Sequence, residues 1–423
     1  MQRSLPGPVS GIRAAVRVPT SKSLTNRALI TAAAANGGRI LRPLDCEDTR
    51  LLAGALGQAG WRVEWSDDLY IGARGMVESA RIDLGNSGTG SRLILGLLAC
   101  VPGRFRVDGT PRLRERPMAP LVDALRDLGA PIDSRGGYLP VEIQGGCLAG
   151  GTLRIRPEVS SQFVSSLLLA APLMVGGLDL EVIGPLPSRP YLDLTREVLE
   201  HYGATVDTES NSRWRVNPGG LEPVDYTVEG DWSAVAFAAA AVAVVGGEVH
   251  IGPLSAQSAQ GDRVVCDILS AAGLAVEFRG EELVVRGPAS RPFTADLSNA
   301  PDLFPALSVV AVAGPAGSVL NGLDHLRHKE SDRLAVMIEN LRRLGAKIEA
   351  STSSFRVVKG LSQTGIGKTA VTAAGDHRIA MAMAVAGLAT GGLELDDDEC
   401  VGKSFPGFWS MWDQLLEGST SPP

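Results

Sequence analysis

Residues 341–349 are Leu-Arg-Arg-Leu-Gly-Ala-Lys-Ile-Glu, and this stretch contains the pattern that decides the fold. A leucine is followed four residues later by a glycine, after which a β-branched residue begins a new segment. This pattern is typical of an amphipathic helix that ends at a glycine and leads into a strand. The stretch therefore predicts an α/β arrangement around residue 345.

The same pattern recurs along the whole chain. Leucine and glycine stand four residues apart at 56–60, 125–129, 199–203, 269–273 and 341–345, and successive glycines are separated by 69, 74, 70 and 72 residues. This period places a sixth helix near residue 415. Six supersecondary repeats of about 70 residues each account for the chain. Its size favours two globular halves of three repeats over a solenoid.

A second series of helices runs parallel to the first. These helices are rich in alanine, and we expect them to begin at polar, cap-forming clusters: Ser21, Gly88, Ser161, Asp231, Asp302 and Asp376. Each repeat therefore carries two helices separated by short strands.

Composition excludes several classes of protein. The 423 residues carry a net charge of −7, so no overall basic field attracts nucleic acid or a lipid surface. The five cysteines are widely spaced, which argues against a disulfide framework or a cysteine zinc site. No apolar run approaches the ~20 residues that span a membrane, and we expect a cytoplasmic protein.

Several predicted helices begin with cations, although helix N-termini favour anions. Pro117 is expected to be the first residue of its helix, directly after Arg116. The cations at these helix starts are Lys22, Arg116, Lys329, Arg333, Arg378 and Lys403. Backbone N–H groups, helix dipoles and cations together favour phosphate or carboxylate. A solvated surface charge explains any single cation, but the repetition indicates a polyanion site.

Other segments fit an anionic or sugar-like ligand. The loop Gly85-Asn86-Ser87-Gly88-Thr89-Gly90 lets backbone N–H groups approach a ligand, unless it is only a turn. Residues 160–162, Ser-Ser-Gln, offer neutral donors and acceptors, unless they serve only as a cap. Asp302 and Glu330 are candidates for proton transfer, with an N-cap and a first-turn acid as the alternatives.

A metal site is not expected. His325 and His328 lie three residues apart, but the sequence offers no third ligand nearby.

These motifs together resemble one family, and the resemblance covers nearly the whole chain. The chain is similar to the EPSP synthases, the 3-phosphoshikimate 1-carboxyvinyltransferases of the enolpyruvyl transferase family. The motifs that carry the resemblance are Lys22-Ser23-Leu24-Thr25-Asn26-Arg27, Gly85-Asn86-Ser87-Gly88-Thr89, Arg114-Glu115-Arg116-Pro117, Ser160-Ser161-Gln162, Lys329-Glu330-Ser331-Asp332-Arg333, Asp376-His377-Arg378 and Lys403-Ser404-Phe405-Pro406.

The resemblance implies a two-domain inverted αβ barrel with six βαβαββ repeats, three per domain, and an active site in the cleft between the domains. Residues 19–230 would form the first domain, and residues 1–18 with 231–423 the second. The implied reaction moves the enolpyruvyl group of phosphoenolpyruvate to the 5-hydroxyl of shikimate 3-phosphate, through a tetrahedral intermediate that releases phosphate. This step serves chorismate and aromatic amino-acid biosynthesis and is the target of glyphosate.

The resemblance also assigns residues. Asp302, Glu330 and Lys22 would be catalytic. The residues implied to hold shikimate 3-phosphate are Lys22, Ser23, Arg27, Ser160, Ser161, Gln162, Ser188, Tyr191, Asp302, His325 and Lys329. Those implied to hold phosphoenolpyruvate are Lys22, Asn86, Gly88, Arg116, Gln162, Arg333, Arg378 and Lys403. We expect no metal and no organic cofactor, no nucleic-acid or membrane partner, and a monomer.

Some positions depart from the family pattern, and two rival functions remain open. His325 stands where many members have asparagine, which puts one ligand contact in doubt. One rival is the enolpyruvyl transferase that acts on UDP-N-acetylglucosamine. That enzyme typically uses a cysteine on a mobile loop, whereas Cys100 lies in an apolar, helix-like run. The other rival is a non-catalytic anion-binding protein on the same fold.

Overall fold

The computed structural model describes residues 1–9, 11–361, 369–417 and 419 of the chain. The chain divides into two compact units, which are described separately. The first unit joins Met1–Pro19 to Gly230–Pro423, and the second is the continuous segment Thr20–Glu229. Within the described ranges, no helix has both the length and the apolar character needed to cross a membrane.

The second unit contains three four-stranded sheets. In spatial order, the strands of one sheet are β14 (Asp225–Thr227), β3 (Gly38–Leu41), β5 (Leu69–Arg74) and β4 (Trp61–Trp65). Those of another are β6 (Ser79–Asp83), β7 (Gly103–Asp108), β9 (Tyr138–Gly145) and β8 (Ile132–Arg135). Those of the third are β10 (Gly151–Ile155), β11 (Leu178–Val182), β13 (Arg213–Val216) and β12 (Val206–Ser210). Its helices are α1 (Lys22–Ala34), α2 (Glu47–Gln58), α3 (Gly88–Ala99), α4 (Pro111–Arg114), α5 (Ala119–Asp127), α6 (Gln162–Ala170), the 3₁₀ helix η1 (Ala171–Leu173) and α7 (Pro190–His201).

The first unit repeats the same pattern. The strands of one sheet are, in spatial order, β16 (Ala275–Arg279), β17 (Glu282–Gly287), β15 (Gly247–Gly252) and β2 (Ile12–Arg17). Those of another are β18 (Thr294–Asp296), β19 (Val319–Asn321), β21 (Ser354–Lys359) and β20 (Lys347–Ala350). A three-stranded sheet contains β1 (Arg3–Leu5), β23 (Leu393–Leu395) and β22 (Thr369–Val371). Its helices are α8 (Trp232–Val245), η2 (Gly261–Val264), α9 (Val265–Ala271), η3 (Pro301–Leu303), α10 (Phe304–Ala313), η4 (Asp324–His328), α11 (Arg333–Arg343), α12 (His377–Gly387), η5 (Glu399–Lys403) and α13 (Phe408–Glu417).

One pairing rule organises the sheets. In every sheet two neighbouring strands are parallel, as in β6 with β7 and β18 with β19, and the remaining pairs are antiparallel. A parallel pair needs a crossover, which α3, α6, α10 and α12 supply between the parallel strands on either side of them, and each four-stranded sheet also contains a hairpin of two consecutive strands. The βαβαββ repeat expected from the resemblance is therefore present.

Two strands belong to a different unit from the helix that follows them in the chain. β2 precedes α1 in the chain but pairs in parallel with β15 of the first unit. β14 precedes α8 in the chain but pairs in parallel with β3 of the second unit. Each of these strands fills the first position of a repeat whose other elements lie elsewhere in the sequence.

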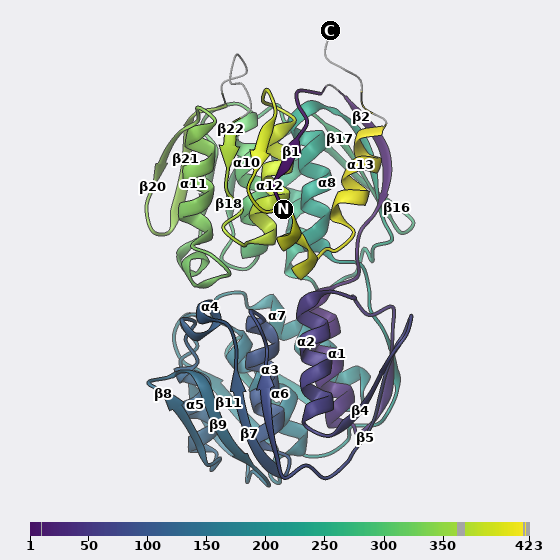
Figure 1. Ribbon diagram of the computed structural model, residues 1–423, viewed down its shortest axis with the longest axis vertical. Coiled ribbons are helices and arrows are strands. Elements are labelled where there is room, and N and C mark those ends of the chain that lie inside the picture. Colours follow the sequence, from purple (N-terminus) through teal and green to yellow (C-terminus); the bar gives the residue numbers. More distant parts are fainter. Residues whose placement is uncertain (10, 362–368, 418, 420–423) are drawn as a thin grey trace. The chain divides into compact units, whose positions relative to one another are not determined.

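The centre of each unit is a group of three helices. α1, α3 and α6 contact one another in the second unit, as α8, α10 and α12 do in the first (Figure 1). Nearly all of their residues are buried, including ten consecutive residues of α1, from Leu24 to Ala33. Helices buried on all sides need an apolar or small residue at almost every position, which explains their leucine and alanine content.

The glycine pattern ends the helices as predicted. Gly60, Gly129, Gly203, Gly273 and Gly345 follow α2, α5, α7, α9 and α11, and their φ angles lie between 87° and 106°. Glycine adopts these angles without a Cβ penalty, which other residues do not. The sixth helix expected near residue 415 is α13.

Candidate functional site

The site residues lie at the N-terminal ends of the buried helices. In the second unit, Ser21 caps α1, Ser87 caps α3 and Ser161 is the N-cap residue of α6. In the first unit, Asp231 caps α8 and Asp376 caps α12. Because helix N-termini carry partial positive charge and unpaired N–H groups, each of these helix ends favours binding of an anion.

Lys22 is the first residue of α1 and has a carboxylate partner. Its Nζ donates to Oδ2 of Asp48 at 2.8 Å, and the Asp48 side chain is only 2% exposed. Asp48 belongs to the first turn of α2, where the helix dipole also favours a negative charge. The pair keeps the Lys22 ammonium in one place.

Arg27 lies one turn further along α1 and is buried. Its guanidinium donates to Thr195 Oγ1 at 2.9 Å, to Ser165 Oγ at 3.2 Å, and to the backbone oxygens of Ser23 at 3.0 Å and Tyr191 at 3.0 Å. Burial lowers the pKa of Arg27 to about 10, so it stays charged near neutral pH. A buried cation held by neutral acceptors lacks a full counter-charge, which favours a bound anion.

Gln162, the first residue of α6, is fixed by two side chains of α3. Arg92 Nη1 donates to its Oε1 at 2.7 Å, and its Nε2 donates to Thr89 Oγ1 at 2.9 Å. Because a guanidinium only donates, Oε1 must face Arg92. The neighbouring Ser160 accepts a hydrogen bond from the Gln162 backbone N–H at 3.2 Å.

The glycine loop and two further predicted residues also belong to the second unit. Asn86 precedes Ser87, the N-cap of α3, and Gly88 is the first residue of that helix, beside the buried Arg116. Ser188 has a left-handed backbone with φ of 57°, and its carbonyl accepts from the Tyr191 N–H at 3.1 Å. A serine in this conformation stores backbone strain, which is concentrated at functional sites in proteins.

Arg333 is the centre of the cluster in the first unit. The guanidinium is 1% exposed and contacts three carboxylates: Asp302 at 2.9 Å, Glu330 at 2.9 Å and Asp376 at 2.9 Å. Burial alone would lower the pKa of Arg333, but these three anions raise it above its ordinary value. Arg333 therefore joins both candidate proton-transfer residues to the start of α12.

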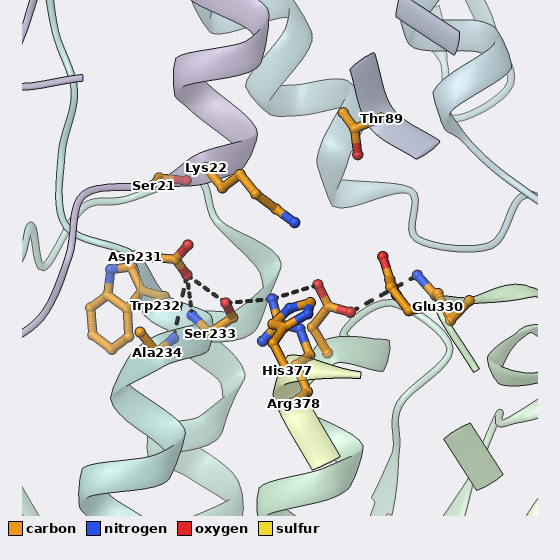
Figure 2. A network of polar contacts seen from close by, with 12 residues as sticks. Ser21, Lys22, Thr89, Asp231, Trp232, Ser233, Ala234, Glu330, His377 and Arg378 are labelled. Carbon is orange, nitrogen blue, oxygen red and sulfur yellow. Dashed lines mark hydrogen bonds and ion pairs between the residues drawn. The ribbon is translucent and has the colours of Figure 1, made fainter. Parts of the chain in front are cut away.

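A second cation reaches Asp302 from α12. Arg378 Nη2 lies 2.9 Å from Oδ2 of Asp302 and donates to Ser233 Oγ at 3.0 Å. The Ser233 hydroxyl in turn donates to Asp231 Oδ1 at 2.5 Å, and Figure 2 shows this run of contacts from Asp231 to Arg378. The carboxylate that caps α8 thus also orients an arginine of α12.

Charge sets the protonation of Asp302 and His325. Burial favours the neutral form of Asp302, but Arg378, Lys329 and Arg333 together hold its pKa below the ordinary value. Lys329 Nζ lies 3.9 Å from Oδ1 of Asp302. Burial, followed by the charge of Lys329, lowers the pKa of His325 to about 3. His325 is therefore neutral at physiological pH.

Two predicted helix starts are wrong. α5 begins at Ala119, with Met118 as its N-cap and Pro120 in its first turn, so Pro117 is not the first helical residue. Lys403 ends η5, and α13 begins five residues later, after Pro406 and Gly407 interrupt the helical pattern. Both cations are nevertheless buried, with exposures of 5% for Arg116 and 4% for Lys403.

Sequence reasoning missed several residues that hold the predicted ones. They are Asp48, Arg92, Ser165, Thr195 and Ser233. Thr89 was named only as part of the glycine loop, without its contact with Gln162. Asp231 and Asp376 were expected only as helix caps. Across the described ranges, no group of three or more histidine, cysteine, aspartate or glutamate side chains is placed to hold a metal ion.

The chain matches one known protein family and is similar in sequence to several of its members. The family described as EPSP synthase (3-phosphoshikimate 1-carboxyvinyltransferase) matches residues 7–412. The 3-phosphoshikimate 1-carboxyvinyltransferase of Methanoculleus marisnigri is 40% identical over 95% of this chain and 96% of its own. That of Mycobacterium ulcerans is 39% identical over 97% and 96%.

Solved structures show the same fold. EPSP synthase from Acinetobacter baumannii superposes with a TM-score of 0.78 and 28% identity, covering 98% of both chains. The enolpyruvyl transferase NikO from Streptomyces tendae superposes with a TM-score of 0.77 over 100% of this chain and 99% of its own, at 18% identity. The second likeness concerns the fold alone.

Proposed function

Because this chain belongs to the EPSP synthase (3-phosphoshikimate 1-carboxyvinyltransferase) family, we propose that its two clusters of side chains hold two anionic substrates and move the protons of the reaction. The chain is a transferase of the shikimate pathway that acts on shikimate 3-phosphate and phosphoenolpyruvate. The observation that carries the proposal is the contact of Arg333 with both Asp302 and Glu330.

The assignment of residues follows the chemistry of the two substrates. The residues that we assign to shikimate 3-phosphate are Lys22, Ser23, Arg27, Ser160, Ser161, Gln162, Ser188, Tyr191, Asp302, His325 and Lys329. Those that we assign to phosphoenolpyruvate are Lys22, Asn86, Gly88, Arg116, Gln162, Arg333, Arg378 and Lys403. Guanidinium and ammonium groups complement phosphate and carboxylate, whereas hydroxyl and amide groups suit the ring hydroxyls of shikimate.

Proton transfer divides between two steps. Protonation of the enol methylene makes the neighbouring carbon electrophilic, and the 5-hydroxyl then attacks that carbon. Asp302 accepts the hydroxyl proton, while Glu330 and Lys22 deliver the methylene proton and remove it again when the tetrahedral intermediate expels phosphate. The fixed cations stabilise negative charge as it moves from the enol phosphate to free phosphate.

Asp302 becomes a stronger base once a ligand is bound, because the ligand weakens the ion pairs that lower its pKa. Without substrate, Arg378 and Arg333 contact its two oxygens, and these cations lower its pKa. A phosphate or carboxylate that binds these arginines shares their attraction, so the pKa of Asp302 rises toward the range of a useful base. Asp302 would therefore become an effective base only after an anionic substrate has bound.

Release of phosphate tests the reaction directly. Purified protein is mixed with shikimate 3-phosphate and phosphoenolpyruvate, each substrate is omitted in turn, and the organic product is identified by mass spectrometry. We expect phosphate only when both substrates are present, together with a product that carries the carboxyvinyl group. Release with a single substrate would contradict the proposal. We also propose that the enzyme is a monomer, which light scattering after size-exclusion chromatography would test.

A further inference from the structure

We infer that Asn340 is a positioning residue: it holds the turn formed by residues 372–376, and this turn sets the place of Arg378 at the start of α12. Asn340 belongs to α11, and its side chain is fully buried. A buried amide needs hydrogen-bond partners, and the partners of this one lie in the turn. The inference rests on the proposed function, because we assign Arg378 to phosphoenolpyruvate.

The turn between β22 and α12 has a backbone conformation that alanine does not favour. Ala374 has a φ angle of 50°, which lies in the left-handed region, and Gly375 follows it with a φ angle of 66°. Glycine adopts this conformation freely, whereas the Cβ atom of alanine makes it unfavourable. A strained residue of this kind persists only where surrounding contacts hold it.

The amide of Asn340 supplies two of these contacts. Its Nδ2 donates to the carbonyl oxygen of Thr372 at 2.8 Å, and its Oδ1 accepts from the N–H of Thr372 at 3.1 Å. One side chain thus pairs with both backbone groups of one residue, as a neighbouring strand would. The turn continues from this point, because Thr372 Oγ1 accepts from the N–H of Ala374 at 3.0 Å. Asp396 Oδ1 accepts from the N–H of Ala373 at 2.7 Å.

The other end of the turn is also held by α11, through Arg333. Arg333 Nε donates to Asp376 Oδ2 at 2.9 Å, and Nη2 donates to Oδ1 at 3.2 Å. Arg333 and Asn340 are seven residues apart in α11, so they lie on one face of the helix. This face therefore holds both ends of the turn, at Thr372 and at Asp376.

The end of the turn determines where Arg378 lies. Asp376 is the N-cap of α12, and its Oδ1 accepts from the N–H of Arg378 at 3.0 Å. The guanidinium of Arg378 contacts Asp302 at 2.9 Å. If the turn relaxes at Ala374, the first residues of α12 shift with it. We therefore expect loss of the Asn340 amide to move Arg378 relative to Asp302.

Rescue by a second substitution separates positioning from a general loss of stability. Asn340→Leu is similar in size but removes both hydrogen bonds, Ala374→Gly removes the strain, and a double variant combines them. The control is Leu341→Ala, because Leu341 is fully buried in the same helix and its truncation weakens packing. Asn340→Asp, which retains the accepting oxygen, takes the place of Asn340→Leu if the latter does not fold. The measured quantities are kcat, the KM of each substrate and the melting temperature.

Relaxation of the turn predicts a specific outcome. We expect Asn340→Leu to lower kcat/KM for phosphoenolpyruvate by about 10-fold and to change the KM for shikimate 3-phosphate by less than about 2-fold. Ala374→Gly alone should have an effect of less than about 2-fold, but it should restore most of the activity that Asn340→Leu loses. Leu341→Ala should lower the melting temperature and keep both kinetic constants within about 2-fold of wild type. A loss in Asn340→Leu that Ala374→Gly does not reduce would overturn the inference.

A structural measurement decides the point without any activity. In a crystal structure of Asn340→Leu, Ala374 should have a negative φ angle, and the Arg378 guanidinium should be displaced by about 1 Å or more. The double variant should have the wild-type turn. A wild-type turn in Asn340→Leu would refute the role of Asn340. Failure of wild type to release phosphate would refute the proposed function, and the crystallographic comparison would still decide whether Asn340 holds the turn.

Discussion

Asp302 and Glu330 share one arginine but have different surroundings, and their roles can be tested separately. We expect Asp302→Asn and Glu330→Gln each to lower kcat by about 100-fold or more, the usual effect of losing a general acid or base. Folding should survive, because Arg333 keeps Asp376 as a counter-charge in both variants. Steady-state kinetics and thermal unfolding measure the two effects.

A control carboxylate makes this test specific. Asp324 is an exposed acid in the first turn of η4, so Asp324→Asn removes one negative charge outside the cluster around Arg333. We expect it to keep near-normal kcat. Near-normal turnover in Asp302→Asn and Glu330→Gln as well would show that neither carboxylate moves a proton.

His325 gives stability a defined dependence on pH. Its pKa is about 3 in the folded protein, because burial and the nearby Lys329 disfavour the imidazolium, whereas an unfolded histidine titrates near 6.5. The unfolded state therefore binds more protons below pH 6.5. The stabilising contribution is complete above pH 6.5 and declines as the pH falls toward 3, by about 2 kcal/mol at pH 5.

Replacement of His325 tests this sign. His325→Asn should lose less stability than wild type between pH 7 and pH 5, as measured by thermal unfolding at each pH. Wild-type His325 should show no titration in NMR spectra over the same range. A signal assigned to His325 that titrates near 6.5 would contradict the buried, neutral imidazole.

Helix ends are the elements for which the sequence was most informative. Gly129 follows α5 with φ of 95°, and an added Cβ would meet nothing within 4 Å. Gly129→Ala should therefore destabilise by about 1 kcal/mol through backbone strain alone. Gly54 lies inside α2 with equally open surroundings, so Gly54→Ala should stabilise by about 0.5 to 1 kcal/mol. Opposite shifts in melting temperature would support this, and equal shifts would contradict it.

The same comparison explains what sequence could and could not predict. A helix end depends on the conformation of one glycine, so the repeats and most helices were found from local spacing. Lys403 was placed at a helix start because cations recur at equivalent positions, but the Pro-Gly pair that follows it delays the helix. The partner of Lys22 is Asp48, 26 residues away, and one of the three partners of Arg333 is Asp376, 43 residues away. No local pattern carries such pairings, because the fold creates them.

For the whole molecule, the pairings of β2 and β14 predict which unit each of these strands stabilises. Val16 of β2 is 4% exposed and lies in the core of the first unit. Val16→Ala should cost about 2 kcal/mol and accelerate hydrogen exchange in β15 and β17, which belong to the same sheet. The backbone amides in strands of the second unit should exchange as slowly as they do in wild type.

A mirror variant completes this test. Ile40 of β3 is fully buried and pairs with Tyr226 of β14 in the second unit. Ile40→Ala should therefore loosen β5 and β14 and leave β15 protected. Exchange that accelerates equally in both units for either variant would mean that the strands do not belong to separate cooperative units.

The pairing of β2 with β15, which is synthesised much later, also bears on how the protein folds as it leaves the ribosome. The second unit is one continuous segment and can fold once Glu229 has left the ribosome. Ile12 is synthesised before all of it but must wait for its partner Gly247, and Leu5 must wait for Leu393. At roughly 5 to 20 residues per second, that delay lasts tens of seconds. During this time the earliest strands have exposed edges that can pair with other chains. Because synthesis proceeds from the N-terminus, these strands are the segment most dependent on chaperones.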